Sequence, residues 1–372
     1  MTLVIALLSL LATTRADLDE SRRALREDVD IHVVRCRTDD DDGGVVVASD
    51  EFPGTFLLDG RSLVATRRLM NSTKPVAAAV ARLPANLTAE LISVTHKPMA
   101  PPSGDLRDYM SLSSYMSPCN VKCNATILRK IGASTCDQWC NKGNNDCNWT
   151  AATDAGEPPM YPCNEATGLP WVFHDYYGGL YAWQYDRPRV DRLWTNILPL
   201  ALQGFYTNQR AALERAALLL RTFFLDPHLG MNPNLNFAQR YPGMYDGVPG
   251  GTVDFTRLKW AIESIKLLEF SDPEAAIWTV RDRADIRNWV ARLLDWYLNS
   301  PNGQAARHLP SDIANDYHIN VLSMSLFLDK HSLALAFAKN DSRAMFEFLI
   351  AADGSMPVTD ADTSDSFGYH SG

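Results

Sequence analysis

Apolar residues recur at helical spacing through the second half of the chain, and this periodicity limits the fold more than any other feature. From Val190 to Phe205 they stand at i, i+3, i+4 and i+7 along one helix face. Similar patterns predict helices over about 210–224, 255–270, 285–299, 313–338 and 342–352. No period-2 pattern separates them, so we predict an all-α fold in which antiparallel helical hairpins form an incomplete α/α toroid. An open α-solenoid is the alternative, although no fixed-period repeat supports it.

Length and composition fit a globular protein. The 372 residues exceed the size at which one core usually stops growing, and 46% of them are hydrophobic. We expect one toroid domain over residues 51–372, preceded by a weakly ordered polar segment over 17–50, with two domains as the alternative. The stretch from Glu51 to Pro98 indicates short helices with loops.

The N-terminus has the pattern of an export signal. A short apolar run, Leu3–Ala12, precedes Thr14, Arg15 and Ala16, where signal peptidase cuts such sequences. We therefore expect a signal peptide over residues 1–16 and a secreted protein, with an uncleaved N-terminal anchor as the alternative. No later segment reaches the roughly 20 apolar residues of a membrane helix. Five glycosylation sequons agree with export, at Asn71, Asn86, Asn124, Asn148 and Asn340.

Cysteines are concentrated in one segment. Six of the seven lie between Cys119 and Cys163, in a polar stretch rich in Asn. In an oxidising compartment this density predicts a small disulfide-rich insertion over 119–163. A zinc site is the competing interpretation, but thiolate metal sites belong to reducing compartments, and we predict no metal.

The net charge of −9 opposes binding to nucleic acid and to anionic membranes. An acidic ligand would need basic residues gathered locally.

Several motifs occur in one order along the chain. PPSGD and DYMSL lie within Ser93–Pro118, and RTFFLDPHLGMNPNLNFAQ spans Arg221–Gln239. GVPGGTVDF spans Gly247–Phe255, WYLNSPNGQA spans Trp296–Ala305 and DGSMP spans Asp353–Pro357. Together they resemble the alginate lyase superfamily of α/α-toroid polysaccharide lyases.

The resemblance implies β-elimination on an acidic polysaccharide, alginate or a related uronan, without a cofactor. This reaction removes the proton next to the sugar carboxylate. It therefore requires neutralisation of that carboxylate, a base, and a proton donor for the departing glycosidic oxygen. The family places Asn-Asn-His at the start of a helix, and an Arg seven residues before a Tyr.

The catalytic motif is only partly present in this chain. An ungapped alignment puts Ser311, Asp312 and Ile313 at the Asn-Asn-His positions, and Asp362 where the Arg is expected. Tyr369 is retained, and we predict that it transfers the proton. The family continues with further helices, whereas this chain ends three residues after Tyr369, so we expect either a fragment or mispredicted gene product, or a protein with a shortened ring.

His318 is a second catalytic candidate, because it lies on the same expected helix as Ile313 and a small insertion would bring it toward the site. The alternative is a solvated or hydrogen-bonded helix histidine. Tyr317, Asn315 and Asn320 lie beside it.

Further side chains are candidates for substrate binding. Three amides suit sugar hydroxyls, namely Asn232, Asn234 and Gln239. Five aromatic residues suit sugar faces or core packing, namely Tyr109, Trp171, Tyr176, Tyr177 and Trp183. Local positive charge would come from His96, Arg107 and His174, with Arg107 standing where the family usually has a His.

Two functions are consistent with these residues. The first is a secreted polysaccharide lyase. The second is a catalytically impaired carbohydrate-binding relative that uses the same cleft without turnover. A structural or interaction role of the cysteine-rich insertion is a third interpretation.

Overall fold

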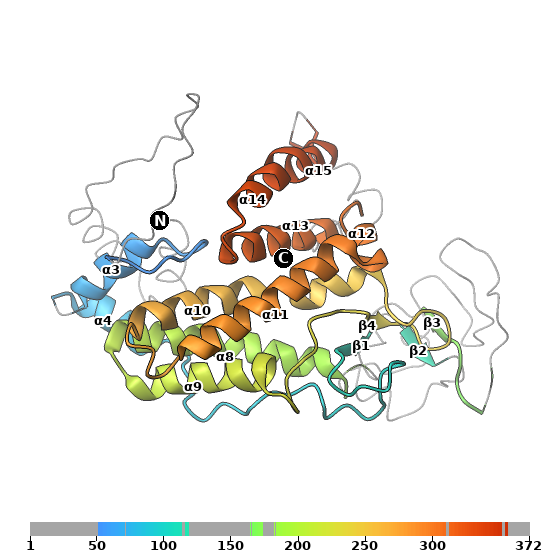
Figure 1. Ribbon diagram of the computed structural model, residues 1–372, viewed down its shortest axis with the longest axis horizontal. Coiled ribbons are helices and arrows are strands. Elements are labelled where there is room, and N and C mark those ends of the chain that lie inside the picture. Colours follow the sequence, from blue (N-terminus) through green and yellow to red (C-terminus); the bar gives the residue numbers. More distant parts are fainter. Residues whose placement is uncertain are drawn as a thin grey trace, which may run out of the picture. The chain divides into compact units, whose positions relative to one another are not determined.

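The computed structural model describes residues 51–70, 72–113, 116–118, 164, 166–173, 182, 184–309, 312–351 and 354–355. This part of the chain is mostly helical, as the periodicity predicts (Figure 1). It divides into two compact units, each assembled from three stretches of sequence. Unit 1 draws its described residues from 1–91, 193–221 and 258–284, and unit 2 from 92–192, 222–257 and 285–372.

Some predicted segments lie outside the described residues. These are the signal peptide (1–16), the polar segment (17–50) and the insertion (119–163), and with them all seven cysteines. The single toroid domain over 51–372 stays a prediction. No helix in the described ranges combines the length and apolar character that crossing a membrane requires.

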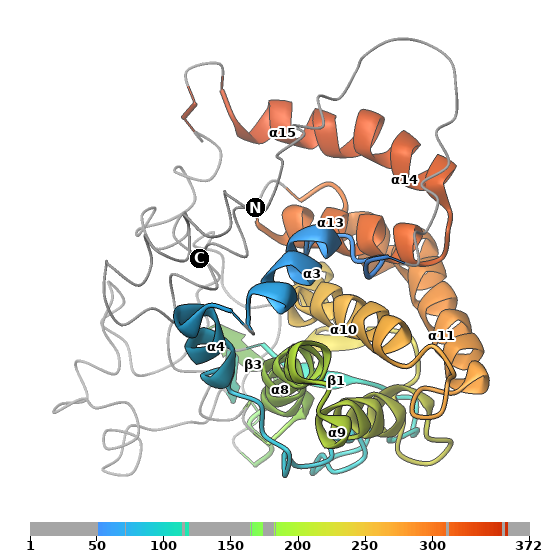
Figure 2. The ribbon, with the colours of Figure 1, turned by 90° about the vertical axis from the view of Figure 1, so that its left-hand side faces the viewer.

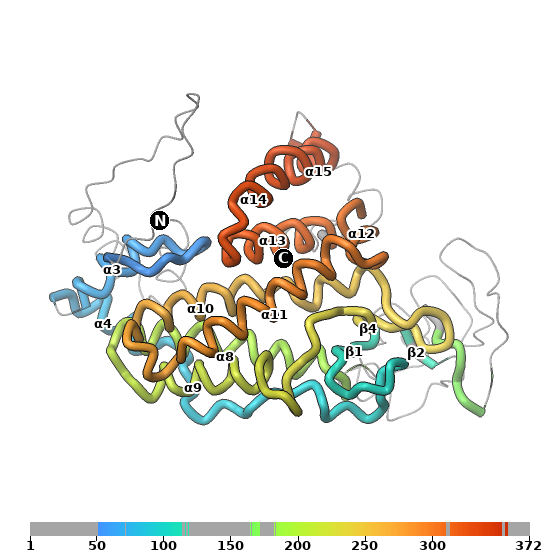
Figure 3. Tube along the Cα trace, viewed as in Figure 1, coloured from blue at the N-terminus to red at the C-terminus, as the bar shows by residue number. Residues whose placement is uncertain are grey.

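Unit 1 is a group of helices around an apolar core. Its helical elements are α3 (Gly60–Leu69), α4 (Lys74–Ala81), most of α8 (Asp186–Thr207), α9 (Arg210–Leu220) and α10 (Leu258–Ser271), followed by the first turn of α11 (Val280–Asn299). The chain reverses between α8 and α9 at Asn208, whose φ is 56° (Figure 3). The core consists of Leu58, Leu63, Ala201, Leu202, Phe205 and Leu267.

Unit 2 contains the remaining helical elements. They are the start of α8, most of the π-helix η1 (Arg221–Leu225), the 3₁₀-helix η2 (Pro249–Phe255), the rest of α11, α12 (Pro301–Ala306), α13 (Asp312–Phe327), α14 (His331–Phe337), the π-helix η3 (Ala338–Ser342) and α15 (Arg343–Leu349). α14, η3 and α15 form a nearly continuous rod that runs alongside α13 (Figure 2). α13 packs against both η2 and α14.

Aromatic rings join α11, α13 and α14. The ring of Tyr317 lies 5.4 Å from that of Tyr297 and 6.2 Å from that of Phe337, measured between centroids. The Tyr317 hydroxyl donates to the Tyr297 carbonyl oxygen at 2.9 Å, and Asn320 Nδ2 donates to the Tyr297 hydroxyl at 3.0 Å. These buried hydrogen bonds fix the helix that carries Ile313 and His318.

The described part of unit 2 also contains four short strands in two pairs. β1 (Met110–Leu112) runs parallel to β4 (Phe237–Arg240), and β2 (Met116–Pro118) runs antiparallel to β3 (Trp171–Phe173). The periodicity does not reveal these strands, because three or four residues are too few to show alternation. The β1–β4 pair is the element that brings the sequence motifs together.

The helix expected over 313–338 ends early, at Phe327, and a new helix begins at His331. Asp329 takes a positive φ of 58°, its N–H donates to Leu326 at 3.1 Å, and the next N–H donates to Ser325 at 2.9 Å. This is the Schellman arrangement of a helix C-terminus, usually formed by glycine. The sequence conceals it because the residue in the left-handed conformation is an aspartate.

Candidate functional site

The β1–β4 pair places the DYMSL and NPNLNFAQ motifs next to each other. Met110 lies opposite Phe237, and Leu112 lies opposite Arg240. The 3₁₀-helix η2, which carries the GVPGGTVDF motif, packs against β4. Three motifs that are far apart in sequence therefore meet within unit 2.

Amides and carboxylates form a cluster at the start of this region. Asn232 Nδ2 donates to Asp105 Oδ2 and to Asp108 Oδ1, both at 2.9 Å, and Asn234 Nδ2 donates to Asp108 Oδ1 at 3.0 Å. Ser103 Oγ donates to the other Asp108 oxygen at 2.6 Å. Among the described residues, no three His, Cys, Asp or Glu side chains are grouped to hold a metal ion. Two of the three predicted sugar-binding amides, Asn232 and Asn234, thus use side-chain donors to join the Asn-Pro-Asn loop to Asp105 and Asp108.

Arg107 ties the same two loops through its backbone and side chain. Its Nε donates to the Gly230 carbonyl oxygen at 2.8 Å, and its own carbonyl oxygen accepts from the Asn232 N–H at 2.9 Å. Its N–H donates to Asp105 Oδ1 at 2.8 Å. That hydrogen bond, followed by the one from Asn232, lowers the pKa of Asp105. The carboxylate of this exposed loop therefore stays ionised.

The carboxylate of Asp254, on η2, is fully buried where η2 packs against β4. It accepts hydrogen bonds from the Tyr109 hydroxyl at 2.9 Å, from Gln239 Nε2 at 3.2 Å and from the Ser111 hydroxyl. Arg187 Nε lies 3.4 Å from Asp254 Oδ1, the oxygen that also accepts from Gln239. Burial raises the pKa of Asp254, and the nearby Arg187 guanidinium opposes that rise. Tyr109 is therefore a core residue whose hydroxyl is already engaged.

Gln239 has an unusual backbone conformation at the centre of this network. Its φ is 48°, its side chain is buried, and its N–H donates to Ser111 Oγ at 2.7 Å. Non-glycine residues with positive φ are uncommon and gather at functional sites, where surrounding contacts hold them. The hydrogen bonds to Ser111 and Asp254 supply those contacts.

Ile313, at the position where the family motif has a His, lies near Gln239, with Gly250 close to both side chains. A methyl group added at Gly250 would lie 3.4 Å from Ile313 Cδ1 and 3.7 Å from Gln239 Oε1. Thr256 Oγ1 also donates to Asp316 Oδ2 at 2.5 Å, which fastens the start of α13 near η2. An apolar side chain therefore lies in the neighbourhood of Gln239 where the resemblance implies an imidazole.

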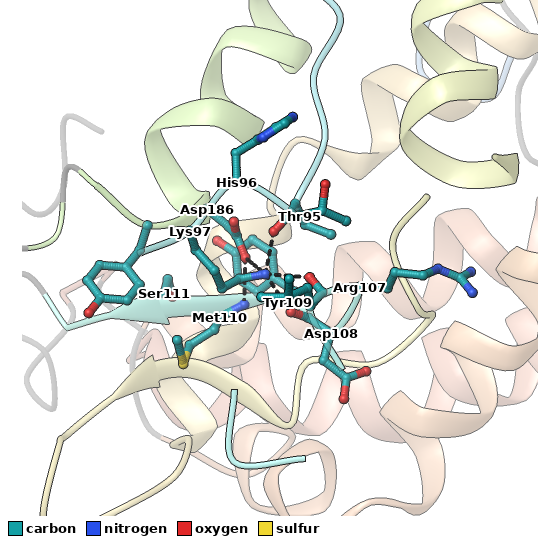
Figure 4. Close-up of polar contacts among 12 residues, drawn as sticks. Thr95, His96, Lys97, Arg107, Asp108, Tyr109, Met110, Ser111 and Asp186 are labelled. Atoms are coloured by element: carbon teal, nitrogen blue, oxygen red, sulfur yellow. Dashed lines mark hydrogen bonds and ion pairs between the residues drawn. The ribbon is translucent and has the colours of Figure 1, made fainter. Parts of the chain in front are cut away.

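A buried ion pair links the loop before β1 to the start of α8. Lys97 Nζ lies 2.9 Å from Asp186 Oδ2, with both side chains fully buried, and donates to the carbonyl oxygens of Leu106 and Asp108 at 2.7 and 3.0 Å (Figure 4). The same Asp186 oxygen accepts from the Met110 N–H at 2.8 Å. Burial raises the pKa of Asp186 to about 7 and lowers the pKa of Lys97, so desolvation outweighs their attraction for both groups.

His96 lies beside this ion pair but faces away from it. Its carbonyl oxygen accepts from Arg189 Nη2 at 2.8 Å, and its exposed ring points away from Lys97 in Figure 4. The figure shows the same for the guanidinium of Arg107. Both side chains therefore point out of the network.

His318 is not part of the β1–β4 network. It is 3% exposed, its Nδ1 lies 2.9 Å from Ser342 Oγ, and its Nε2 lies 3.3 Å from the Arg307 carbonyl oxygen. Its ring centroid lies 4.9 Å from that of Phe337. Burial lowers its pKa. Proton transfer to a sugar would require these contacts to break.

The remaining candidates lie largely outside the described residues. These are Tyr369, His174, Tyr176, Tyr177, Trp183, Ser311, Asp362 and the side chain of Asp312. Trp171 is described, and it packs against the cluster of Met110, Leu112, Ala182 and Tyr185. Sequence reasoning missed Asp105, Asp108, Asp254, Lys97 and Asp186. Their positions inside the PPSGD, DYMSL and GVPGGTVDF motifs are the signal that marks the first three.

Comparison with known proteins identifies the family. The model of the family described as alginate lyase matches residues 93–371. The crystal structure of an alginate lyase from Bacteroides ovatus at 1.60 Å resolution is similar, with a TM-score of 0.65 and 20% sequence identity over 85% of this chain and 72% of that chain. At this identity the likeness shows the fold. No curated protein matches the sequence. Since the family model spans most of the chain and agrees with the motifs, this protein belongs to the alginate lyase family.

Proposed function

We propose that this protein is a secreted polysaccharide lyase that cleaves alginate or a related uronan by β-elimination, without a cofactor. The observation that carries the proposal is the family match, which extends to residue 371 and so includes Tyr369. In this proposal Tyr369 transfers the proton. Gln239, held by Asp254, and the outward side chains of Arg107 and His96 contribute to binding of the acidic sugar.

A second candidate function is binding of the same polysaccharide without turnover. Ile313 near Gln239 favours it, because an isoleucine neither neutralises a carboxylate nor moves a proton. Asp362, where the family has an Arg, adds a negative charge that would repel a uronate.

A direct assay separates the two functions. Purified protein is incubated with alginate and other uronans, and the ultraviolet absorbance of the unsaturated product is followed. A lyase gives rising absorbance that Tyr369→Phe abolishes, while Tyr245→Phe, a change at an exposed tyrosine, leaves it intact. Absence of product from every uronan refutes the lyase proposal.

Binding then decides the second function. A protein that binds uronan oligomers on a glycan array without forming product is the non-catalytic relative. Absence of binding as well as turnover removes both candidates.

We further propose that the helices form an incomplete α/α toroid and that residues 119–163 are a disulfide-rich insertion. The helical hairpins and the cysteine spacing support these proposals. Mass spectrometry of non-reduced peptides tests the disulfides, and the N-terminal sequence of protein recovered from culture medium tests cleavage after residue 16.

A further inference from the structure

A groove of about 600 Å³ lies between the Asn-Pro-Asn loop and α11 in unit 2. Its volume falls within the range of roughly 300–1,000 Å³ typical of small-molecule sites. One wall is formed by Pro233 and Asn234. The other wall is one face of α11 and the residue after it, with Ala291, Arg292, Asp295, Trp296, Asn299 and Ser300.

The lining is held in place by hydrogen bonds within the protein. Trp296 Nε1 donates to Asn236 Oδ1 at 2.7 Å, so the indole can offer only ring carbons to the groove. Asn299 Nδ2 donates to Asp295 Oδ1 at 2.7 Å. Asn234 is fixed by its hydrogen bond to Asp108, which belongs to the amide–carboxylate cluster. A ligand would therefore meet a largely preformed surface.

The polar groups of the groove match a sugar. Exposed Asp295 and Asn299 offer carboxylate and amide oxygens that accept hydrogen bonds from hydroxyl groups, next to the apolar surface of Trp296. The open groove thus combines apolar surface with a few polar groups, which is the combination found in binding sites for small polar ligands.

Arg292 adds a cation without a partner. Its side chain is exposed, and no ion pair or side-chain hydrogen bond joins its guanidinium to another residue in the described part of the chain. A guanidinium binds a carboxylate through two parallel hydrogen bonds. We propose that this groove is a binding subsite for one uronate unit of the polysaccharide, with Arg292 on the carboxylate and Asp295 and Asn299 on the hydroxyls. The acidic nature of the sugar rests on the proposed function.

The test measures binding of a tetrameric uronate and of the same tetramer with its carboxyl groups reduced. Calorimetry is performed with the full chain carrying Tyr369→Phe, which prevents loss of the probe. Adding Arg292→Gln should weaken binding of the uronate about fivefold to tenfold and leave binding of the reduced tetramer unchanged. Asn299→Ala should weaken both tetramers about twofold to threefold.

Arg68→Gln is the matched control, since Arg68 is an exposed arginine on helix α3. Circular dichroism confirms that each variant folds. If Arg292→Gln binds the uronate as tightly as Arg68→Gln does, the subsite is refuted.

The outcomes also separate this subsite from the proposed function. Turnover by the wild type, together with binding that does not depend on Arg292, leaves the lyase and removes the subsite. Arg292-dependent binding without turnover supports the subsite and refutes the lyase. No binding of either tetramer, together with no turnover by the wild type, removes both.

Discussion

At the scale of single residues, side chains that the motifs mark as sugar contacts are already engaged with the protein. Tyr109 is fully buried against Asp254, and Asn232 and Asn234 donate to Asp105 and Asp108. Their hydrogen bonds hold the two loops in place. Substitutions here should therefore change stability before they change sugar affinity.

Tyr109→Phe tests this expectation. The change removes a buried hydroxyl that donates to Asp254 and leaves that carboxylate with one donor fewer. We expect a loss of about 1–3 kcal/mol in the free energy of unfolding, measured with urea, and unchanged affinity for uronan. Tyr245→Phe, at a side chain that is 56% exposed, should change neither quantity. Weaker sugar binding without loss of stability would show that Tyr109 contacts substrate.

Asp186 should make stability depend on pH. Burial raises the pKa of its carboxyl to about 7, above the value of 3.8 for an exposed aspartate. Between these values the folded protein keeps a proton that the unfolded chain releases, so the free energy of unfolding falls as pH rises. Asp186→Asn removes this titration. The stability of wild type relative to the variant should therefore fall by roughly 1–3 kcal/mol from about pH 4 to 7 in urea unfolding.

The control is Ser72→Ala, at an exposed residue whose hydroxyl donates to the Leu69 carbonyl oxygen and does not titrate between pH 4 and 7. Its stability difference from wild type should stay nearly constant over this range. If the stability of wild type relative to Asp186→Asn rises with pH instead, attraction to Lys97 outweighs burial of the Asp186 carboxyl.

At the scale of elements, the sequence predicts the long helices with periodic apolar faces, but it does not predict the short strands and turns. The helices α8, α9, α10 and α11 were expected within a few residues of their observed bounds, because long apolar faces repeat every turn. The strand β4 has only four residues, and the turn after α13 has Asp329 in the left-handed conformation in place of a glycine, so neither leaves a pattern. Local propensity is too weak a signal for either feature.

Gly303, near the start of α12, should reject even a methyl group. Ser300 Oγ accepts from the Gly303 N–H at 3.0 Å, and a Cβ at position 303 would lie 2.3 Å from the Tyr297 carbonyl oxygen. Alanine normally stabilises a helix relative to glycine by roughly 0.5–1 kcal/mol. Here we expect Gly303→Ala to destabilise the protein by about 1–3 kcal/mol, measured by thermal or urea unfolding.

Gly54→Ala is the matched control, since no heavy atom lies within 4 Å of a Cβ built there. Its stability should be unchanged or slightly higher. Equal stability of the Gly303→Ala protein would mean that the chain relaxes around Tyr297 without cost.

At the scale of the whole molecule, the site is harder to predict than the fold, because its partners are distant in sequence. Asp254 binds Ser111, which lies 143 residues away, and Lys97 binds Asp186. The motifs identify Gln239 and the Asn-Pro-Asn loop, but no spacing rule connects them to these carboxylates. The network depends on the parallel pairing of β1 with β4, which the sequence pattern does not predict.

The net charge of −9 should affect how an acidic ligand arrives. At low ionic strength the charge of the protein repels a uronan over a Debye length of about 30 Å, which shrinks to about 8 Å at 0.15 M. We expect the association rate of a uronate oligomer to rise as salt is added over this range, measured by stopped flow. The rate for a carboxyl-reduced oligomer should stay constant. A rate that falls with salt would indicate that local basic residues dominate.

The pairing of β1 with β4 also fixes when the site can appear as the protein folds. Asp105 meets Asn232 across 127 residues, a span that includes α8 and α9. On a ribosome the acidic loop emerges first, and its amide partners follow only after those two helices have been synthesised. Contacts with such long sequence separation form slowly. The site is therefore assembled late in folding. A substitution that misfolds α8 or α9 should disturb the site even when the substituted residue contacts none of its residues.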